Sequence, residues 1–501
     1  MREQWNNRLV FVLAAVGSAA GLGNIWRFPY QVASNGGGAF LIPYFIALVT
    51  VGIPMLCLEF YMGHRFRSGA PTAWGKICKR GETLGWFSIF VAFMVAAYYS
   101  VIIGWIFNYL AFSLNLAWTK TGSSDFFFNN VLKISSGPFN LGGFSKVVVI
   151  GVALTWISVY LAIKDGTESV GKIVKYTVAL PILLLFIMVV RIAFLDGAIS
   201  GFDYYLKPDF SKLKDFSVWS AAYGQILLSV GLGYGIMIAY SSYLPKDSDI
   251  TLNATITALA NSGISFLAGF SVFGTLGYIA QATGKTIAEV AGSGGIGMAF
   301  VVYPEAITKL PFGYWGQVLF ALSFFIMLLT LGIDSAFSLV ENVTTALSDK
   351  FDYSKKKTTK VTISLMFILS LLFTTKGGLY WLDIMDHYLN NFGVIPIVLI
   401  ELLLIIKYVK LENLLKYLDE RSDVKFRFGV QIFCFAGISL GLIFGGVIIK
   451  EVMSFVRGSF YGGYSGKAIF VGGYLMMMVG VISSILLRKN TEKKELVIEE
   501  V

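Results

Sequence analysis

The chain has 501 residues, of which 56% are hydrophobic and only 14% are charged, and its mean hydropathy is +0.71. This composition excludes a soluble globular protein and indicates an all-α polytopic membrane protein. The formal net charge of +10 comes from Lys and Arg that gather in short loops, so it indicates membrane topology rather than a surface for nucleic acid.

Apolar runs long enough to cross a lipid bilayer recur along the whole chain, and we expect twelve membrane-spanning helices. They are predicted at residues 9–32, 39–63, 84–116, 145–163, 170–195, 218–243, 250–281, 315–347, 360–376, 382–406, 428–452 and 464–487. An even number of spans places both termini on one side, and the loop distribution of Lys and Arg makes that side cytoplasmic. We therefore expect a multi-pass protein of the plasma membrane.

Glycine interrupts two of these runs, at residues 17–24 and 229–235. Glycine at this density weakens a helix by about 1 kcal/mol per residue, so both segments should unwind locally. Unwound backbone at membrane depth is tolerated where it lines a cavity inside the protein, and paired breaks in two halves of a chain indicate a transporter site.

The motif Gly-Leu-Gly recurs at 21–23 and 231–233, which predicts a 5+5 inverted repeat with broken helices 1 and 6. The predicted parts are a first repeat at 1–195, an outer loop at 196–217, a second repeat at 218–407, two extra helices at 408–487 and a cytoplasmic tail at 488–501.

Charged residues inside spans cost roughly 2.5–3.5 kcal/mol each, so each needs an account. Arg27 could snorkel to the membrane surface or pair with Asp383 or Asp386, which share one helical face. Asp334 lies next to Ser335, and a carboxylate beside a hydroxyl fits a hard cation, although a structural hydrogen bond remains an alternative.

Glu59 is a further carboxylate inside a predicted span, and we expect it to hold unwound backbone rather than bind an ion directly. His64 and His387 have no Cys, His or Glu neighbours at metal-binding spacing, and the sequence contains no nucleophile elbow or phosphate loop. These observations predict that the protein is not an enzyme.

The residues around the first break resemble one family closely. Trp5, the run 17–30 with Gly-Leu-Gly-Asn-Ile-Trp-Arg-Phe-Pro-Tyr, and Asn-Gly-Gly-Gly-Ala-Phe at 35–40 are similar to the neurotransmitter:sodium symporter family, and the likeness continues to the motif at 382–386. The resemblance implies the fold of the bacterial leucine transporter and uptake of a small molecule driven by Na⁺ through alternating access.

Site residues follow from this resemblance by position. It implies a substrate pocket of Ser18, Ala19, Gly21, Val95, Tyr99, Leu228, Gly231, Tyr234, Ser335 and Leu339. It implies a first sodium site of Ala19, Asn24, Ser229 and Asn261, and a second of Gly17, Ala20, Leu331, Asp334 and Ser335. It also implies an outer gate of Arg27, Asp386 and Tyr99, and an inner gate of Arg2, Asp349 and Tyr243.

Departures from the family pattern concern the substrate and chloride. Gly21 stands where monoamine carriers place an Asp, which favours an amino acid, and Leu228 with Gly231 favours a bulky neutral one. Ser265 replaces a carboxylate of chloride-independent members, so Cl⁻ is a candidate ligand. The implied chloride residues are Tyr44, Gln225, Ser229, Asn261 and Ser265.

Three alternatives stay open. The substrate could be a non-α amino acid or a betaine-like osmolyte, the protein could be a substrate-binding receptor that does not transport, and it could form a homodimer.

Overall fold

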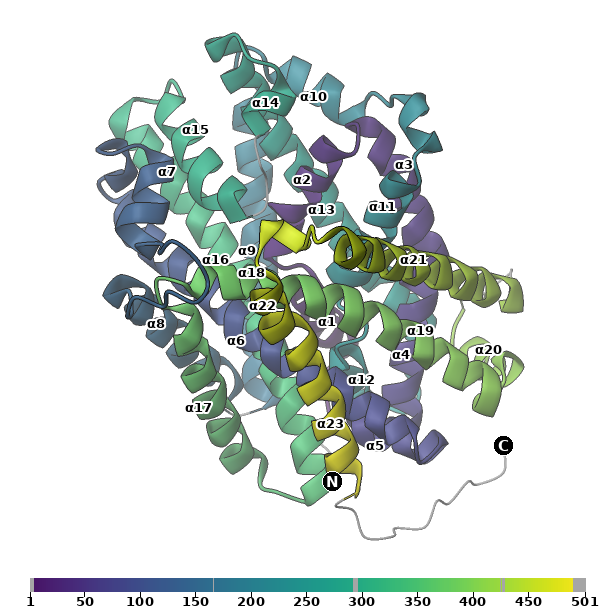
Figure 1. Ribbon diagram of the computed structural model, residues 1–501. Helices are drawn as coiled ribbons and strands as arrows, with labels where there is room; N and C mark the ends of the chain where they lie inside the picture. Colours follow the sequence, from purple (N-terminus) through teal and green to yellow (C-terminus); the bar gives the residue numbers. More distant parts are fainter. Residues whose placement is uncertain (1–3, 165, 292–295, 424, 426–428, 490–501) are drawn as a thin grey trace.

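The computed structural model describes residues 4–164, 166–291, 296–423, 425 and 429–489. Within these ranges the chain folds into helices joined by loops, without a strand (Figure 1). Most of the predicted C-terminal tail, residues 490–501, lies outside the described residues.

The first part of the chain contains α1 (Arg8–Ala19), α2 (Arg27–Ser34), α3 (Leu41–Ala47), α4 (Ile53–Phe66), α5 (Ala70–Ile77), α6 (Gly81–Ser113), α7 (Ser123–Asp125), α8 (Lys146–Ile163), α9 (Thr167–Ala193), α10 (Ala198–Leu206), α11 (Phe216–Ser229) and α12 (Ile236–Ser241). The second part contains α13 (Ile250–Thr283), α14 (Ile287–Ala291), α15 (Tyr303–Lys309), α16 (Gly313–Phe351), α17 (Lys355–Phe373), α18 (Gly378–Tyr388), α19 (Ile395–Leu404), α20 (Leu411–Asp419), α21 (Gly429–Arg457), α22 (Gly466–Ile469) and α23 (Met476–Lys489).

Short segments of other helix types lie between these. The 3₁₀ segments are η1 (Leu22–Asn24), η2 (Gly38–Phe40), η4 (Ala117–Thr119), η6 (Phe210–Lys214) and η10 (Tyr461–Gly463). The π-helical segments are η3 (Leu48–Gly52), η5 (Phe126–Leu132), η7 (Met298–Val302), η8 (Leu389–Val394), η9 (Ile405–Val409) and η11 (Phe470–Leu475). Because η3, η8 and η11 connect α-helices without interruption, α3–α4, α18–α19 and α22–α23 form longer helical rods.

Nine helices of the described chain are long and apolar enough to cross a membrane. A tenth span is the pair of segments Arg8–Ala19 and Leu22–Ser34, which meet at a bend of 63°. The all-helical membrane fold predicted from composition is therefore confirmed, while the count of twelve spans and the inverted repeat stay predictions.

The two other predicted spans have helices at their positions that do not meet these criteria. Residues 218–243 form α11 of 14 residues and α12 of 6 residues, separated by irregular backbone at 230–235. α17 has 19 residues and begins with three successive lysines, which shorten its apolar part. Bilayer crossing at these two places depends on packing against neighbouring helices, a property that length and composition do not measure.

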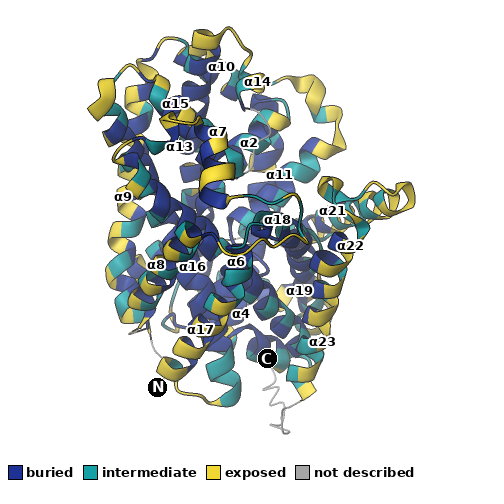
Figure 2. Ribbon diagram, turned by 60° about the vertical axis from the view of Figure 1, so that its left-hand side comes forward, coloured by how far each residue is buried: buried dark blue, intermediate teal, exposed yellow. Residues whose placement is uncertain are grey.

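α1 lies near the centre of the bundle, where it packs against α9, α12, α13 and α16 (Figure 1). We call the end of the molecule that carries α10, α14 and α15 the upper end, and the end that carries α5 the lower end. Buried residues fill the interior and exposed ones lie on the outer faces (Figure 2). Large apolar side chains are exposed along α8, α9, α21 and α23, as expected for helices whose outer faces contact lipid.

Close backbone packing joins α4 to α12 at Gly63. A Cβ atom at this position would overlap the Ile238 carbonyl oxygen and the Ser241 hydroxyl. A Cβ atom at Gly263, which lies inside α13, would meet nothing within 4 Å.

We predict that Gly63→Ala lowers the midpoint temperature of unfolding, because overpacking a close helix contact costs about 1–3 kcal/mol. Gly263→Ala is the matched control, since it brings the same gain in helix propensity, about 1 kcal/mol, without the overlap. Thermal unfolding of the purified variants in one detergent measures both. Equal midpoints for the two variants would contradict the packing argument.

Candidate functional site

The first break separates α1 from α2, and the backbone of residues 20–26 lies outside both α-helices. The Gly21 amide lies 3.2 Å from Asn24 Oδ1, and the Leu22 amide donates to the Tyr99 hydroxyl at 3.3 Å. A Cβ atom at Gly21 would lie 2.8 Å from Ser335 Oγ. Glycine is therefore required here because α6 and α16 come too close to the unwound chain for a side chain.

The second break, between α11 and α12, turns through left-handed backbone at Gly231, Gly233 and Gly235, whose φ angles are 74°, 78° and 79°. Such angles strain residues with a Cβ atom, which explains the glycines. The Gly233 amide donates to Glu59 Oε1 at 2.7 Å, and Asn342 Nδ2 donates to the Tyr234 carbonyl at 2.7 Å. Glu59 thus has the backbone-holding position predicted for it, and Asn342 is a second holder that sequence reasoning missed.

Asp334 of α16 faces the end of α1 and is only 1% exposed. Neither carboxylate oxygen accepts a hydrogen bond from a described residue, and the nearby Thr177 hydroxyl donates to the Ile173 carbonyl at 3.2 Å. A Cβ atom at Gly17 would lie 2.5 Å from Asp334 Oδ2, so the bare glycine brings the α1 backbone up to the carboxylate. A buried charge without a partner is costly, and a bound cation would compensate it.

Ser335 completes this region from the next position of α16. Its hydroxyl donates to the Ser18 carbonyl at 3.1 Å. The region therefore presents oxygen ligands of the carbonyl, carboxylate and hydroxyl types, which suit a hard cation. Within the described residues, no cluster of three or more His, Cys, Asp or Glu side chains could hold a metal, which makes a transition-metal site a poor fit.

A network of amides and hydroxyls joins the two breaks through α13. Asn24 Nδ2 donates to Asn261 Oδ1 at 2.8 Å and to Ser265 Oγ at 2.9 Å, and Asn261 Nδ2 donates to Ser229 Oγ at 2.9 Å. All four side chains are buried. Three of the four residues assigned to the first sodium site, Asn24, Ser229 and Asn261, thus lie together and come from three separate segments.

The predicted chloride residues lie next to this network. The Tyr44 hydroxyl donates to Ser262 Oγ at 3.1 Å, and the buried Gln225 Oε1 has no hydrogen-bond partner among the described residues. Ser262 precedes Ser265 by about one turn of α13, and its hydroxyl was not singled out in the sequence analysis.

A cavity of about 740 Å³ connects these groups and is lined by both breaks. All ten predicted substrate residues line it: Ser18, Ala19, Gly21, Val95, Tyr99, Leu228, Gly231, Tyr234, Ser335 and Leu339. The cavity continues past Arg27 and Asp386 to Tyr461 and Tyr464, so it extends well beyond the size of one amino acid.

Arg27 of α2 and Asp386 of α18 both line this cavity but form no ion pair with each other, and Arg27 forms none with any other described residue. Asp386 instead accepts hydrogen bonds from Tyr98 at 2.6 Å and from Asn390 at 2.9 Å. The neighbouring Asp383 accepts from Tyr461 at 3.0 Å and Tyr464 at 2.8 Å. The predicted gate residues therefore face one passage without closing it, and their pairing stays a prediction.

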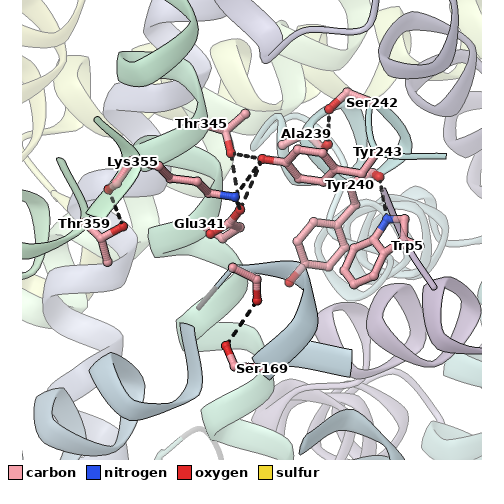
Figure 3. A network of polar contacts seen from close by, with 11 residues as sticks. Trp5, Ser169, Ala239, Tyr240, Ser242, Tyr243, Glu341, Thr345, Lys355 and Thr359 are labelled. Atoms are coloured by element: carbon pink, nitrogen blue, oxygen red, sulfur yellow. Dashed lines mark hydrogen bonds and ion pairs between the residues drawn. The ribbon is translucent and has the colours of Figure 1, made fainter. Parts of the chain in front are cut away.

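The lower side of the breaks is filled by a polar and aromatic network (Figure 3). Trp5 Nε1 donates to the Tyr240 carbonyl at 2.9 Å, and the Trp5 amide donates to the Tyr243 carbonyl at 3.1 Å. Lys355 Nζ lies 2.6 Å from Glu341 Oε1, and the Tyr243 hydroxyl lies 3.1 Å from the same oxygen. This network connects the residues before α1 to the end of α12 and to α16 and α17.

Of the predicted inner gate, Tyr243 lies in this network and Arg2 lies outside the described residues. Asp349 accepts a hydrogen bond from the Gly69 amide at 2.7 Å. Sequence reasoning missed Glu341 and Lys355. A signal for Glu341 existed, since it follows Asp334 by seven residues and so lies on the same face of α16, two turns away.

The comparisons with known proteins agree with this geometry. A profile described as Sodium:neurotransmitter symporter family matches residues 2–124 and 118–491. The chain belongs to this family. It is 41% identical over 496 residues, covering 98% of the chain and 99% of the relative, to a protein of Methanocaldococcus jannaschii described as "Uncharacterized sodium-dependent transporter MJ1319".

Animal relatives match a shorter part of the chain. The "Sodium- and chloride-dependent GABA transporter 2" of Rattus norvegicus is 37% identical over 423 residues, covering 77% of the chain and 69% of the relative. The protein of the same description from Homo sapiens is 36% identical over the same length and shares. The chain is thus a membrane transporter of a sodium-dependent family, and the prediction that it is not an enzyme is confirmed.

We predict that Asp334→Asn abolishes most of the thermal stabilisation by Na⁺, because the variant keeps the side-chain shape but loses the charge. In potassium buffer without sodium the same variant should unfold at an equal or higher temperature, since it no longer buries an unpaired carboxylate. Unfolding temperatures measured in both buffers test this. A structural role would instead lower the unfolding temperature in both buffers and leave the increment from Na⁺ intact.

Proposed function

We propose that this protein is a Na⁺-coupled symporter that imports a neutral, fairly bulky amino acid by alternating access. The observation that carries the proposal is the buried carboxylate of Asp334, which lies beside the end of α1 and has no hydrogen-bond partner among the described residues. A cation bound there would link α16 to the first break, and the substrate cavity begins at the same break. Ion binding and substrate binding would therefore share one backbone segment.

The chemistry of the cavity supports an amino acid as the cargo. Among the described residues that line it, the charged side chains are Arg27, Asp383 and Asp386, and all three belong to the gate region. Around the breaks the lining is uncharged, so an amine without its own carboxylate would lack a counter-charge. A zwitterion supplies that charge itself, with its carboxylate at the first sodium site.

Part of the cavity lining is apolar. Val95, Ile102, Leu228 and Leu339 line it, and they offer an uncharged aliphatic surface to a substrate side chain. This apolar part of the lining supports a neutral and bulky amino acid.

We assign the two sodium sites, the gates and the membrane orientation as the sequence implies. The first sodium site uses Ala19, Asn24, Ser229 and Asn261, and the second uses Gly17, Ala20, Leu331, Asp334 and Ser335. The upper end faces the outside, because the short loops at the lower end carry clusters of Lys and Arg, for example at 76–80 and 355–357. Both termini are then cytoplasmic and the membrane is the plasma membrane.

A second candidate substrate is a non-α amino acid such as γ-aminobutyrate. The observation in its favour is the 37% identity to a protein described as a GABA transporter. A receptor that binds without transporting fits less well, because the chain keeps charged residues on both sides of the cavity.

The proposal predicts that purified protein in proteoliposomes accumulates a neutral amino acid only when a Na⁺ gradient points inward. L-Leucine and γ-aminobutyrate serve as the two probes, each also tested as a competitor of the other. Asp334→Asn is the inactive control. Equal uptake of a probe after replacement of Na⁺ by K⁺ at matched membrane potential would refute coupling to sodium.

We further propose that Cl⁻ binds beside the first sodium site. Two Na⁺ ions and a zwitterion bring two positive charges, whereas Asp334 supplies one negative charge and Ser265 supplies none. Glu59 already accepts the Gly233 amide, and Tyr44, Ser262 and Ser265 offer hydroxyls to an anion.

We predict that replacing Cl⁻ by gluconate reduces Na⁺-driven uptake strongly in the wild type and little in Ser265→Glu, whose carboxylate supplies the missing charge. Ser323→Ala, a substitution on α16 at a half-buried serine that does not line the cavity, is the control for unspecific effects of mutation. Full wild-type uptake in gluconate would show that the anion is not required.

A further inference from the structure

Asp386 accepts hydrogen bonds from two neighbouring side chains in this structure, in which it forms no ion pair with Arg27. Its Oδ1 atom accepts the Tyr98 hydroxyl at 2.6 Å and the Asn390 amide at 2.9 Å. Tyr98 is 3% exposed and Asn390 is 7% exposed, so these donors are not replaced easily by water. Hydrogen bonds to a charged acceptor are among the stronger ones, and two of them satisfy a carboxylate that lacks its cationic partner.

The orientation of the Asn390 amide follows from the chemistry of its neighbours. An ionised carboxylate only accepts hydrogen bonds, so the NH₂ group of Asn390 must face Asp386. Its carbonyl oxygen then faces the Tyr234 hydroxyl, which donates to it at 3.0 Å. A chain of hydrogen bonds therefore runs from Tyr234 through Asn390 to Asp386.

Tyr234 connects this chain to the substrate cavity. It lines the cavity at the second break, and its backbone carbonyl accepts the Asn342 amide at 2.7 Å. The preceding residue, Gly233, is held by Glu59 at 2.7 Å. The phenol is thus anchored at its backbone and directed at Asn390 by its hydroxyl.

Asn390 is the second residue of the π-helical segment η8, Leu389–Val394. Such a segment inserts an extra residue into a helix and shifts the side chains that follow, and it often occurs at functional sites. Asn390 lies four residues after Asp386, so its amide and the carboxylate meet on one face of the same helix.

We propose that Tyr98 and Asn390 are positioning residues that replace Arg27 as the partners of Asp386 while the gate is open, and that Tyr234 orients Asn390 for this role. When the gate closes, Asp386 gives up its hydrogen bonds to Tyr98 and Asn390 and forms an ion pair with Arg27. The Asp386 carboxylate therefore has a polar partner in both states. The inference rests on the proposed outer gate, but it does not depend on which substrate is carried.

The experiment measures how often the cavity is open in Na⁺ alone. Leu379 of α18 lines the cavity, so Leu379→Cys reports access for a maleimide. Cys78→Ala and Cys434→Ala remove the accessible thiols, while the buried Cys57 is kept. The full chain carrying these changes is labelled in nanodiscs.

We expect Asn390→Ala and Tyr98→Phe to lower the ratio of open to closed molecules by about tenfold each, because each removes a hydrogen bond to a charge from the open state only. Tyr234→Phe should lower it less. Asn391→Ala is the matched control with unchanged labelling, since its amide donates to the His387 carbonyl at 2.8 Å instead.

Arg27→Ala separates a gate role from a structural one. Without Arg27, Asp386 has no competing partner, so adding Asn390→Ala should leave the labelling of Arg27→Ala unchanged. An effect of Asn390→Ala that is equal with and without Arg27, or unchanged labelling in both single variants, would overturn the inference. Failure of the proposed function is recognised separately, as absent uptake of both probes by a protein whose labelling still responds.

Discussion

A backbone amide or carbonyl that leaves a helix inside a bilayer must find its partner within the protein, and this requirement governs the centre of the structure. The Gly233 amide donates a hydrogen bond to Glu59, the Tyr234 carbonyl accepts one from Asn342, and the Gly21 amide donates one to Asn24. Glu59 and Asn342 come from α4 and α16, which pack near the second break, whereas Asn24 belongs to the first break itself. The polar residues of the bundle are therefore arranged around two short stretches of unwound chain, and the cavity lies between those stretches.

Most buried carboxylates follow the same requirement, and the exceptions within the described residues are Asp334 and Glu401, neither of which has a partner for either oxygen. Asp383 and Asp386 accept tyrosine hydroxyls, and Glu341 is paired with Lys355. Asp334 differs from Glu401 in having the α1 backbone at Gly17 directly beside it, and this neighbour is the physical basis for placing a cation from solution between Asp334 and α1.

The sequence alone located functional features wherever a residue type has few roles inside a membrane. Glycine clusters located both breaks, and carboxylates within apolar runs located Glu59 and Asp334. The ten substrate positions came from family resemblance, and all of them line the cavity. Boundaries of helices were harder to predict, because α17 carries three successive lysines within the helix and the stretch predicted as one span at 218–243 is divided into α11 and α12.

Contacts between distant segments could not be read from the sequence. Tyr234 and Asn390 are 156 positions apart, and Tyr98 and Asp386 are 288 apart. Tyrosine and asparagine are also common in helices for many reasons, so their residue type carries little information about a partner. The π-helical segment that contains Asn390 has no signature in a single sequence either.

The polar and aromatic network around Trp5 links the two broken helices mechanically. Trp5, just before α1, is bound through its indole and its backbone to Tyr240 and Tyr243 at the end of α12, and the Trp5 and Tyr240 rings meet edge to face at 5.3 Å. α1 and α12, the lower halves of the two broken helices, are thereby joined through Trp5, and the glycine-containing breaks lie directly above them. A displacement of one of these halves must therefore carry the other with it or break the contacts of Trp5.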